Sequence, residues 1–113
     1  MPNTLECVSG YEEGVRTGDL SIVPFANNVS FNGPILEQPI KGKEAVIGFL
    51  TEAAKQMSNF HIKQHIIQGE HACTLIEFEA GDTTIEACDY FRVSEGKISE
   101  VRVFFDSRLL PQE

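Results

Sequence analysis

The sequence has no tryptophan, only three cysteines and no long apolar run. Because no stretch approaches the roughly 20 apolar residues of a membrane helix, we expect no membrane span. The opening residues, MPNTLECVSG, lack the basic flank and apolar centre of a secretory signal. The three cysteines (Cys7, Cys73 and Cys88) are an odd number without Cys-x-x-Cys spacing, a pattern that favours reduced thiols in the cytoplasm.

Basic side chains are also scarce. Lysines and arginines number 9 against 17 aspartates and glutamates, which gives a net charge of −8, and no stretch clusters the basic residues. A chain this acidic is a poor partner for the phosphates of nucleic acids or for anionic lipids. We therefore expect no nucleic acid and no membrane among its partners.

Signals for a cofactor or a metal are missing as well. The sequence has no glycine-rich phosphate loop and no nucleotide-binding fingerprint, so no cofactor is predicted. His61 and His65 lie four residues apart on a predicted strand, which would place them on one face about 13 Å apart. That separation is too large for one metal ion, and no third ligand is evident, so no metal site is predicted.

The composition that is present, 42% hydrophobic and 23% charged over 113 residues, is typical of one globular domain spanning residues 1–113. Apolar residues at helical spacing predict a first helix over Thr4–Arg16, ended by Gly18; its stripe comprises Leu5, Val8, Tyr11, Glu12 and Val15. Asp19 is a candidate N-cap for a short helix that extends to Val23. Val29–Asn32 is a brief predicted strand. A further helix begins near Lys43, with a stripe of Val46, Phe49, Leu50, Ala53, Ala54 and Met57.

After this helix the apolar period changes to two, which predicts strands joined by short turns. The four predicted strands are Phe60–Gln68, His71–Ala80, Thr84–Val93 and Ile98–Asp106. Helices followed by such strands predict an α+β fold, in which a cone-shaped, curved antiparallel sheet wraps around the N-terminal helices. The cone would leave a cavity suited to a small ligand.

Asp89 departs from the pattern of the third long strand. It falls in phase with the apolar residues Ile85, Ala87, Phe91 and Val93, and in antiphase with Glu86, Cys88, Tyr90 and Arg92. A carboxylate on an apolar face needs a donor or a proton, and perturbed carboxylates in cavities are candidates for function. The alternative is a buried aspartate satisfied by the backbone or by a tyrosine hydroxyl. Tyr11 is the second candidate, because its ring can be buried while its hydroxyl seeks a partner; otherwise it is an amphipathic core residue.

Three stretches, GDLSIVPFANNVSFNGPI, GKEAVIGFL and DYFRVSEGKISEVRVFFD, carry a resemblance to a known family. Together with the first helix they resemble the nuclear transport factor two-like (NTF2-like) superfamily, closest in pattern to its SnoaL-like and ketosteroid isomerase-like branches. The resemblance covers nearly the whole chain and implies a single SnoaL-like domain with a cystatin-like α+β barrel. It is less informative about activity, because this fold hosts isomerases, cyclases, dehydratases, epoxide hydrolases and binding modules.

The resemblance implies catalytic roles for Tyr11 and Asp89. Tyr11, eight residues before Asp19, matches the tyrosine of the isomerase oxyanion hole, and Asp89 matches the protonated aspartic acid that also donates there. The isomerases' general base is absent, because Gly33 occupies the position of that aspartate before the proline. The epoxide hydrolase pattern is not met either, since Val103 occupies the position of its late-strand aspartate.

Core aromatic residues can also contact a ligand in this fold, because the cavity is the open end of the core. The predicted binding residues are Phe25, Phe31, Phe49, Phe91, Val101 and Phe105. Asp106, in antiphase with Val101 and Phe105, is interpreted as structural. On the other face of the sheet, Cys73, Leu75, Cys88 and Tyr90 interrupt the charges. Superfamily members usually pair through that face, so we expect a homodimer.

Three functions follow from these observations. The first is an isomerase or lyase acting on a small apolar carbonyl compound, with Tyr11 and a neutral Asp89 donating to an enolate oxygen. Its base would come from the substrate, a water or a carboxylate such as Glu37. The second is a non-catalytic pocket for a small carbonyl or phenolic compound, and the third is a structural dimer with a vestigial cavity. The missing acid at Gly33 favours binding, whereas the Tyr11 and Asp89 pair favours chemistry.

Overall fold

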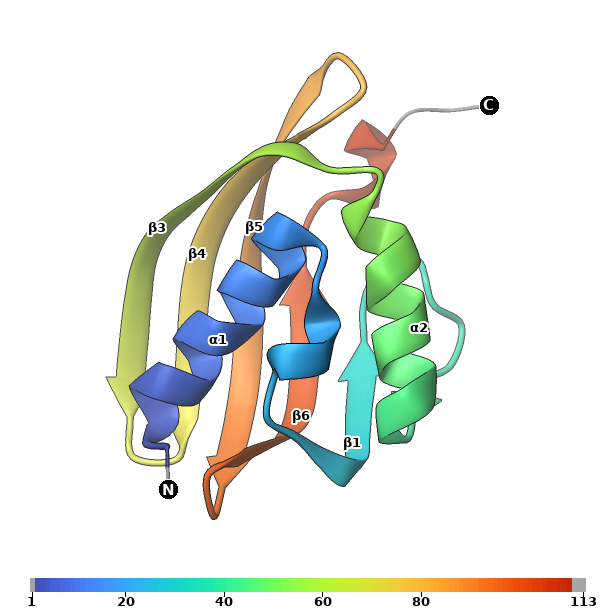
Figure 1. Cartoon of the computed structure of the whole chain (residues 1–113). Coiled ribbons are helices and arrows are strands. Elements are labelled where there is room, and N and C mark those ends of the chain that lie inside the picture. Colours follow the sequence, from blue (N-terminus) through green and yellow to red (C-terminus); the bar gives the residue numbers. More distant parts are fainter. Residues whose placement is uncertain (1, 111–113) are drawn as a thin grey trace.

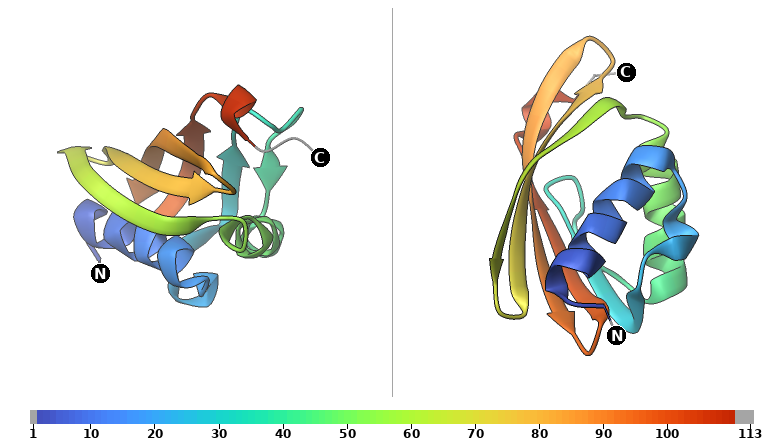
Figure 2. Two further views of the ribbon diagram at one scale, coloured as in Figure 1. Left: turned by 90° about the horizontal axis from the view of Figure 1, so that it is seen from above. Right: turned by 60° about the vertical axis from the view of Figure 1, so that its left-hand side comes forward.

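The computed structural model describes residues 2–110, which form helices packed on one six-stranded sheet (Figure 1). In chain order the elements are α1 (Thr4–Thr17), η1 (Leu20–Ile22), β1 (Phe25–Asn32), β2 (Ile40–Lys41), α2 (Lys43–Ala54), β3 (Ser58–Gln68), β4 (His71–Ala80), β5 (Thr83–Ser94), β6 (Lys97–Phe104) and η2 (Ser107–Leu109), where η denotes a 3-10 helix. The strands lie in the order β2-β1-β6-β5-β4-β3. The sheet is curved and unclosed, and α1 and α2 cover its concave face (Figure 2), as the predicted α+β cone requires.

Local signals fix both ends of α1. At its start the Asn3 side chain accepts a hydrogen bond from the Glu6 backbone N–H, and the Glu6 carboxylate accepts one from the Asn3 N–H. At its end Gly18 adopts the left-handed conformation, with φ of +84°. The Asp19 carboxylate then accepts from the Ser21 N–H and begins η1. The predicted helix and the predicted cap at Asp19 are both confirmed.

The sheet departs from the prediction at its β1 edge. Strands β3 to β6 pair antiparallel, but β1 pairs with β6 in parallel and with β2 antiparallel. β1 begins at Phe25 and not at Val29, although its pairing with β6 is irregular between Phe25 and Ser30. Residues 26–28, with the sequence Ala-Asn-Asn, have weak strand propensity, so the sequence does not predict the first half of β1. The two-residue β2 was not predicted.

Irregular pairing in β3 corrects the prediction for the two histidines. The register between β3 and β4 shifts between Ser58 and His61 and again between Ile62 and Gln64. Across these shifts His61 opposes Glu77, whereas His65 opposes Thr74. Because Glu77 and Thr74 are three residues apart on a regular strand, they face opposite sides of the sheet. His61 and His65 therefore lie on opposite faces, and the predicted common face is wrong because it assumed an unbroken period of two.

Two groups of buried apolar side chains fill the space between the helices and the sheet. The larger joins α1, α2 and the lower sheet around Tyr11, Phe25, Phe91 and Val101. The smaller consists of Ile76, Phe78, Ala80, Ile85 and Ala87 on the upper parts of β4 and β5. No helix within residues 2–110 is long and apolar enough to cross a membrane.

Candidate functional site

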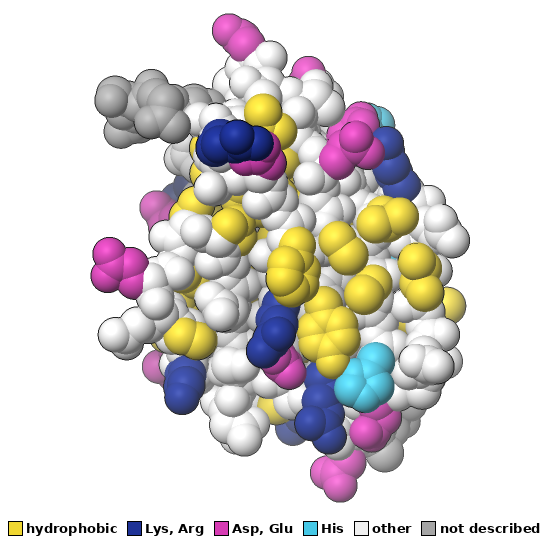
Figure 3. All heavy atoms as spheres, turned by 180° about the vertical axis from the view of Figure 1, so that it is seen from behind, with side chains coloured by type: hydrophobic (Ala, Val, Ile, Leu, Met, Phe, Trp, Pro, Cys, Tyr) yellow, Lys and Arg dark blue, Asp and Glu magenta, His cyan; other side chains and the backbone are white. Residues whose placement is uncertain are grey.

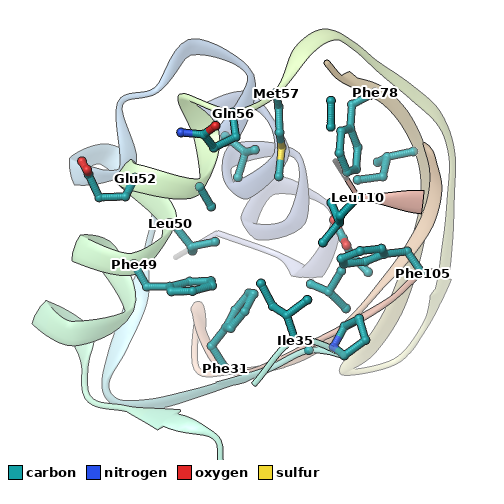
Figure 4. A pocket seen from close by; sticks show the side chains of 18 of the residues that line it. Phe31, Ile35, Phe49, Leu50, Glu52, Gln56, Met57, Phe78, Phe105 and Leu110 are labelled. Carbon is teal, nitrogen blue, oxygen red and sulfur yellow. The ribbon is translucent and has the colours of Figure 1, made fainter. Parts of the chain in front are cut away.

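A cavity of about 390 Å³ lies between α2, the segment after β1 and the concave face of the sheet (Figure 4). Its walls are largely aromatic and aliphatic, with Phe31, Phe49, Leu50, Met57, Phe78 and Phe105 among them. Four lining residues carry polar side chains: Tyr11, Glu52, Gln56 and Asp89. Glu52 and Gln56 are exposed, whereas Tyr11 and Asp89 are buried. The polar groups inside this apolar cavity are therefore Tyr11 and Asp89.

Tyr11 projects from α1 and is held by two other rings. Its ring meets Phe91 edge-on at 4.9 Å between centroids and Phe25 at 6.1 Å, and its side chain is 2% exposed. Tyr11 lines the cavity together with Asp89. Burial, together with the carboxyl groups of Asp89 and Glu12, raises the pKa of Tyr11 well above its ordinary value. The hydroxyl therefore stays protonated and available as a donor.

Asp89 lies in the middle of β5 on the concave face, as its phase predicts. It is 3% exposed and stands between Thr74 of β4 and Val103 of β6 in the sheet register. Burial raises the pKa of Asp89 to about 6, against the lowering effect of a hydrogen bond with Glu12. The cavity thus contains a carboxyl group that titrates near neutral pH.

Glu12 is the part of the site that the sequence analysis did not identify. It is 0% exposed, and its carboxyl group lies within hydrogen-bonding reach of Asp89. Burial first, and the charge of Asp89 second, raise the pKa of Glu12 well above its ordinary value. The signal was present, because Glu12 falls in the apolar stripe of the first helix just as Asp89 falls on the apolar face of its strand. Glu12 does not line the cavity, whereas Asp89 does.

The six predicted binding residues divide into two groups. Phe31, Phe49 and Phe105 line the cavity. Phe25, Phe91 and Val101 do not; they lie in the packed core with at most 1% exposure, and the first two hold the Tyr11 ring.

Three further residues from the sequence analysis, Gly33, Glu37 and Asp106, differ in whether they reach the cavity. Gly33, which the family resemblance aligns with the isomerases' base, lines the cavity wall. Glu37 is exposed and does not line the cavity. Asp106 lies after β6, where it begins η2 by accepting from the Arg108 N–H and pairs with the Arg108 guanidinium at 2.7 Å. These bonds lower the pKa of Asp106 to about 2, in keeping with a structural role.

Residues 2–113 match the model of a protein family described as "Domain of unknown function (DUF4904)". The chain belongs to this family. A search of curated proteins found no match for the DUF4904 chain.

Solved structures resemble the DUF4904 chain over almost its whole length. An NTF2-like protein of unknown function from Cytophaga hutchinsonii has a TM-score of 0.82 at 19% identity, covering 96% of this chain and 94% of the other. A protein with a cystatin-like fold from Silicibacter pomeroyi has a TM-score of 0.85 at 20% identity, covering 91% and 76%. A steroid delta-isomerase from Pseudomonas aeruginosa has a TM-score of 0.82 at 17% identity, covering 94% and 81%. Identities this low establish the fold alone, so the DUF4904 chain has an NTF2-like, cystatin-like fold.

Proposed function

We propose that this DUF4904 protein binds a small apolar compound that carries one oxygen group, a carbonyl or a phenol, in the cavity between α2 and the sheet. The observation that carries the proposal is the placement of Tyr11 and Asp89 as buried polar groups inside otherwise apolar walls. A cavity of about 390 Å³ falls within the range of small-molecule sites. Apolar walls favour a ligand with little charge, and the two polar groups fix where its oxygen lies.

The Tyr11 hydroxyl supports this assignment most directly. A buried tyrosine hydroxyl usually has a hydrogen-bond partner, and Tyr11 lines the cavity. A ligand oxygen in the cavity would accept from it. Phe25 and Phe91 already hold the ring, so little side-chain freedom would be lost on binding.

Titration with equilenin, a fluorescent phenolic steroid, tests the proposal. The protein has no tryptophan, so the ligand's own emission can be followed without interference. We expect saturable binding that weakens about tenfold in Tyr11→Phe, since this change removes one hydrogen bond and leaves the ring. Tyr90→Phe is the matched control, because Tyr90 lies on the outer face and pairs with His71. If neither small phenols nor enones bind, the proposed function is wrong and the cavity is vestigial.

A second candidate function is isomerisation or lysis of a small carbonyl compound. It is favoured by the fold shared with a steroid delta-isomerase and by the positions of Tyr11 and Asp89 at the cavity. The residue facing the cavity at the isomerases' base position is Gly33, which cannot accept a proton. Binding without turnover is therefore the function that the site supports better.

A further inference from the structure

Glu12 is an unusual residue for the interior of this fold. Its side chain is 0% exposed, and within residues 2–110 no N–H or O–H group other than a protonated Asp89 carboxyl could donate to Oε1 or Oε2. An ionised carboxylate can only accept hydrogen bonds, so two adjacent carboxylates cannot bond to each other. An unpartnered anion at this depth is strongly unfavourable. One of the two groups must therefore hold a proton.

No buried cationic side chain among residues 2–110 offsets the charge of Glu12 and Asp89. Within residues 2–110 no lysine or arginine is buried. On α1 the titratable group beside the pair is Tyr11, and on β5 it is Cys88, whose pKa is raised to about 11 by burial first and by Cys73 second. Both are neutral at neutral pH, as a phenol and a thiol.

The neighbouring strands add no charge either. Thr74 of β4 opposes Asp89 and bonds through its hydroxyl to His65 Nδ1 of β3 at 2.8 Å. Burial lowers the pKa of His65, so its ring is neutral at neutral pH. On the other side Asp89 is opposed by Val103 of β6. Two acids in contact, in apolar surroundings and without a cation, ionise one at a time.

We propose that Glu12 and Asp89 share one proton at neutral pH, with Glu12 as the donor within the pair and Asp89 as the hydrogen-bond acceptor that faces the cavity. The orientation follows from position, because Asp89 lines the cavity and Glu12 does not. The pKa values agree with it: that of Glu12 is raised well above its ordinary value, and that of Asp89 only to about 6. Glu12 is thus a positioning residue that acts on the ligand through Asp89.

This arrangement selects a class of ligand, a step that rests on the proposed function of the cavity. Asp89 as an acceptor needs a donor on the ligand, whereas Tyr11 needs an acceptor. A single hydroxyl group does both, accepting from Tyr11 and donating to Asp89. A phenol or alcohol is therefore preferred over a ketone or an ether of the same skeleton, which offers no donor. The family resemblance, by contrast, implies that Asp89 itself donates.

The proton is detected without any ligand, by ¹³C NMR of the side-chain carboxyl carbons across pH 4 to 9. We expect the Glu12 and Asp89 signals to titrate together, with one proton shared by the pair at pH 7. Two fully ionised carboxylates at pH 7 would overturn the proposal, as would two fully protonated acids. Glu13→Gln serves as a control variant, since Glu13 neighbours Glu12 in sequence but pairs with Arg16 at the surface.

Glu12→Gln and Glu12→Leu together separate a coupled pair from a lone buried acid. Glutamine keeps the shape and still donates to Asp89, whereas leucine removes the donor, so we expect Asp89 to titrate about one pH unit or more higher in Glu12→Leu than in Glu12→Gln. Equal Asp89 titrations in the two variants would show that Glu12 does not donate to it. If neither variant folds, Asp89→Asn provides the reciprocal measurement on Glu12.

The ligand class is tested with 2-naphthol and 2-methoxynaphthalene, which differ in the hydroxyl proton that Asp89 would accept. We expect naphthol to bind about tenfold more tightly at pH 7.5, with the difference lost in Asp89→Leu. Equal affinities in the wild type would overturn the ligand preference. If neither compound binds, the ligand preference and the proposed function both fail, while the carboxyl titration still decides whether the pair shares a proton.

Discussion

Glu12 and Asp89 give the stability of this protein an inverted dependence on pH. Burial raises the pKa of both groups, and that of Asp89 rises from 3.8 to about 6. Between these two values the folded protein binds more protons than the unfolded chain. The free energy of unfolding therefore falls as the pH rises through this window, the opposite of what salt-bridged carboxylates produce.

The resulting prediction concerns melting temperatures at pH 5 and pH 7.5. The wild type should be less stable at pH 7.5, by on the order of 2 kcal/mol in the free energy of unfolding. Asp89→Asn should flatten this dependence, because the variant has no proton to lose at that position. Thermal unfolding followed by circular dichroism at the two pH values gives both slopes.

Asp106→Asn is the control for that comparison. The pKa of Asp106 is lowered to about 2, so its stabilising effect is complete above about pH 4 and is lost only in stronger acid. The variant should lose some stability at both pH values yet keep the wild-type slope. Equal slopes in the wild type and Asp89→Asn would mean that Asp89 is not a buried titrating acid.

At the scale of elements, the contact between α1 and the segment around η1 depends on Gly14. A Cβ atom there would lie 2.8 Å from Val23 Cγ2 and 3.0 Å from the backbone oxygen of Asp19. Gly14→Ala should therefore destabilise the fold by about 1–3 kcal/mol, despite the better helix propensity of alanine. Gly48→Ala in α2, where nothing lies within 4 Å, should instead stabilise it by up to about 1 kcal/mol. Chemical denaturation measures both, and equal effects would contradict the close approach.

The segment after β1 allows a test of the missing base. A Cβ atom at Gly33 would have its nearest neighbours at 3.8 Å (Phe31) and 3.9 Å (Val103), which is ordinary contact on the cavity wall. Gly33→Asp should thus place a carboxylate in the cavity and raise the isomerisation of a β,γ-unsaturated steroid ketone tenfold or more, with Tyr11 as donor. The absorbance of the conjugated product gives the rate. Gly33→Asn is the matched control, and equal rates in the two variants would contradict the prediction.

The elements that could be predicted from the sequence are those with a regular apolar period. α1, α2 and strands β3 to β6 all carry such a period over eight or more residues. The start of β1 and the two-residue β2 do not, because their strand geometry comes from pairing with each other and with β6. The shifts in β3 escaped prediction for a related reason: a bulge leaves the composition of a strand unchanged.

The candidate site shows the same limit. Periodicity places Asp89 and Tyr11 on inward faces, and the structure agrees. Periodicity does not say how far along a strand the cavity begins. It therefore could not distinguish Phe91, which lies in the core, from Phe105, which lines the cavity. The contact of Glu12 with Asp89 depends on how α1 packs across β5, which no local pattern encodes.

At the scale of the whole molecule, no α-helix within residues 2–110 covers the convex face of the sheet (Figure 2). Seen from this side, apolar side chains gather over the strands between charged groups (Figure 3). Exposed fractions reach 55% for Phe104, 50% for Ile66 and 38% for Leu75. The sheet register places Leu75 and Phe104 on either side of Cys88, and Ile66 opposite Cys73. Exposed apolar patches of this kind favour association.

The homodimer expected from the sequence thus stays a prediction, with this patch as its interface. Multi-angle light scattering at micromolar protein should give the mass of two chains. Phe104→Glu should shift the mass to one chain, because a twofold interface would bring two added negative charges together. Ile22→Glu is the control, since Ile22 is 63% exposed on η1, away from the patch, and the variant should stay dimeric. A wild-type protein with the mass of one chain would overturn the dimer. Because the cavity opens on the concave face, the monomeric Phe104→Glu variant should still bind equilenin if the wild type does.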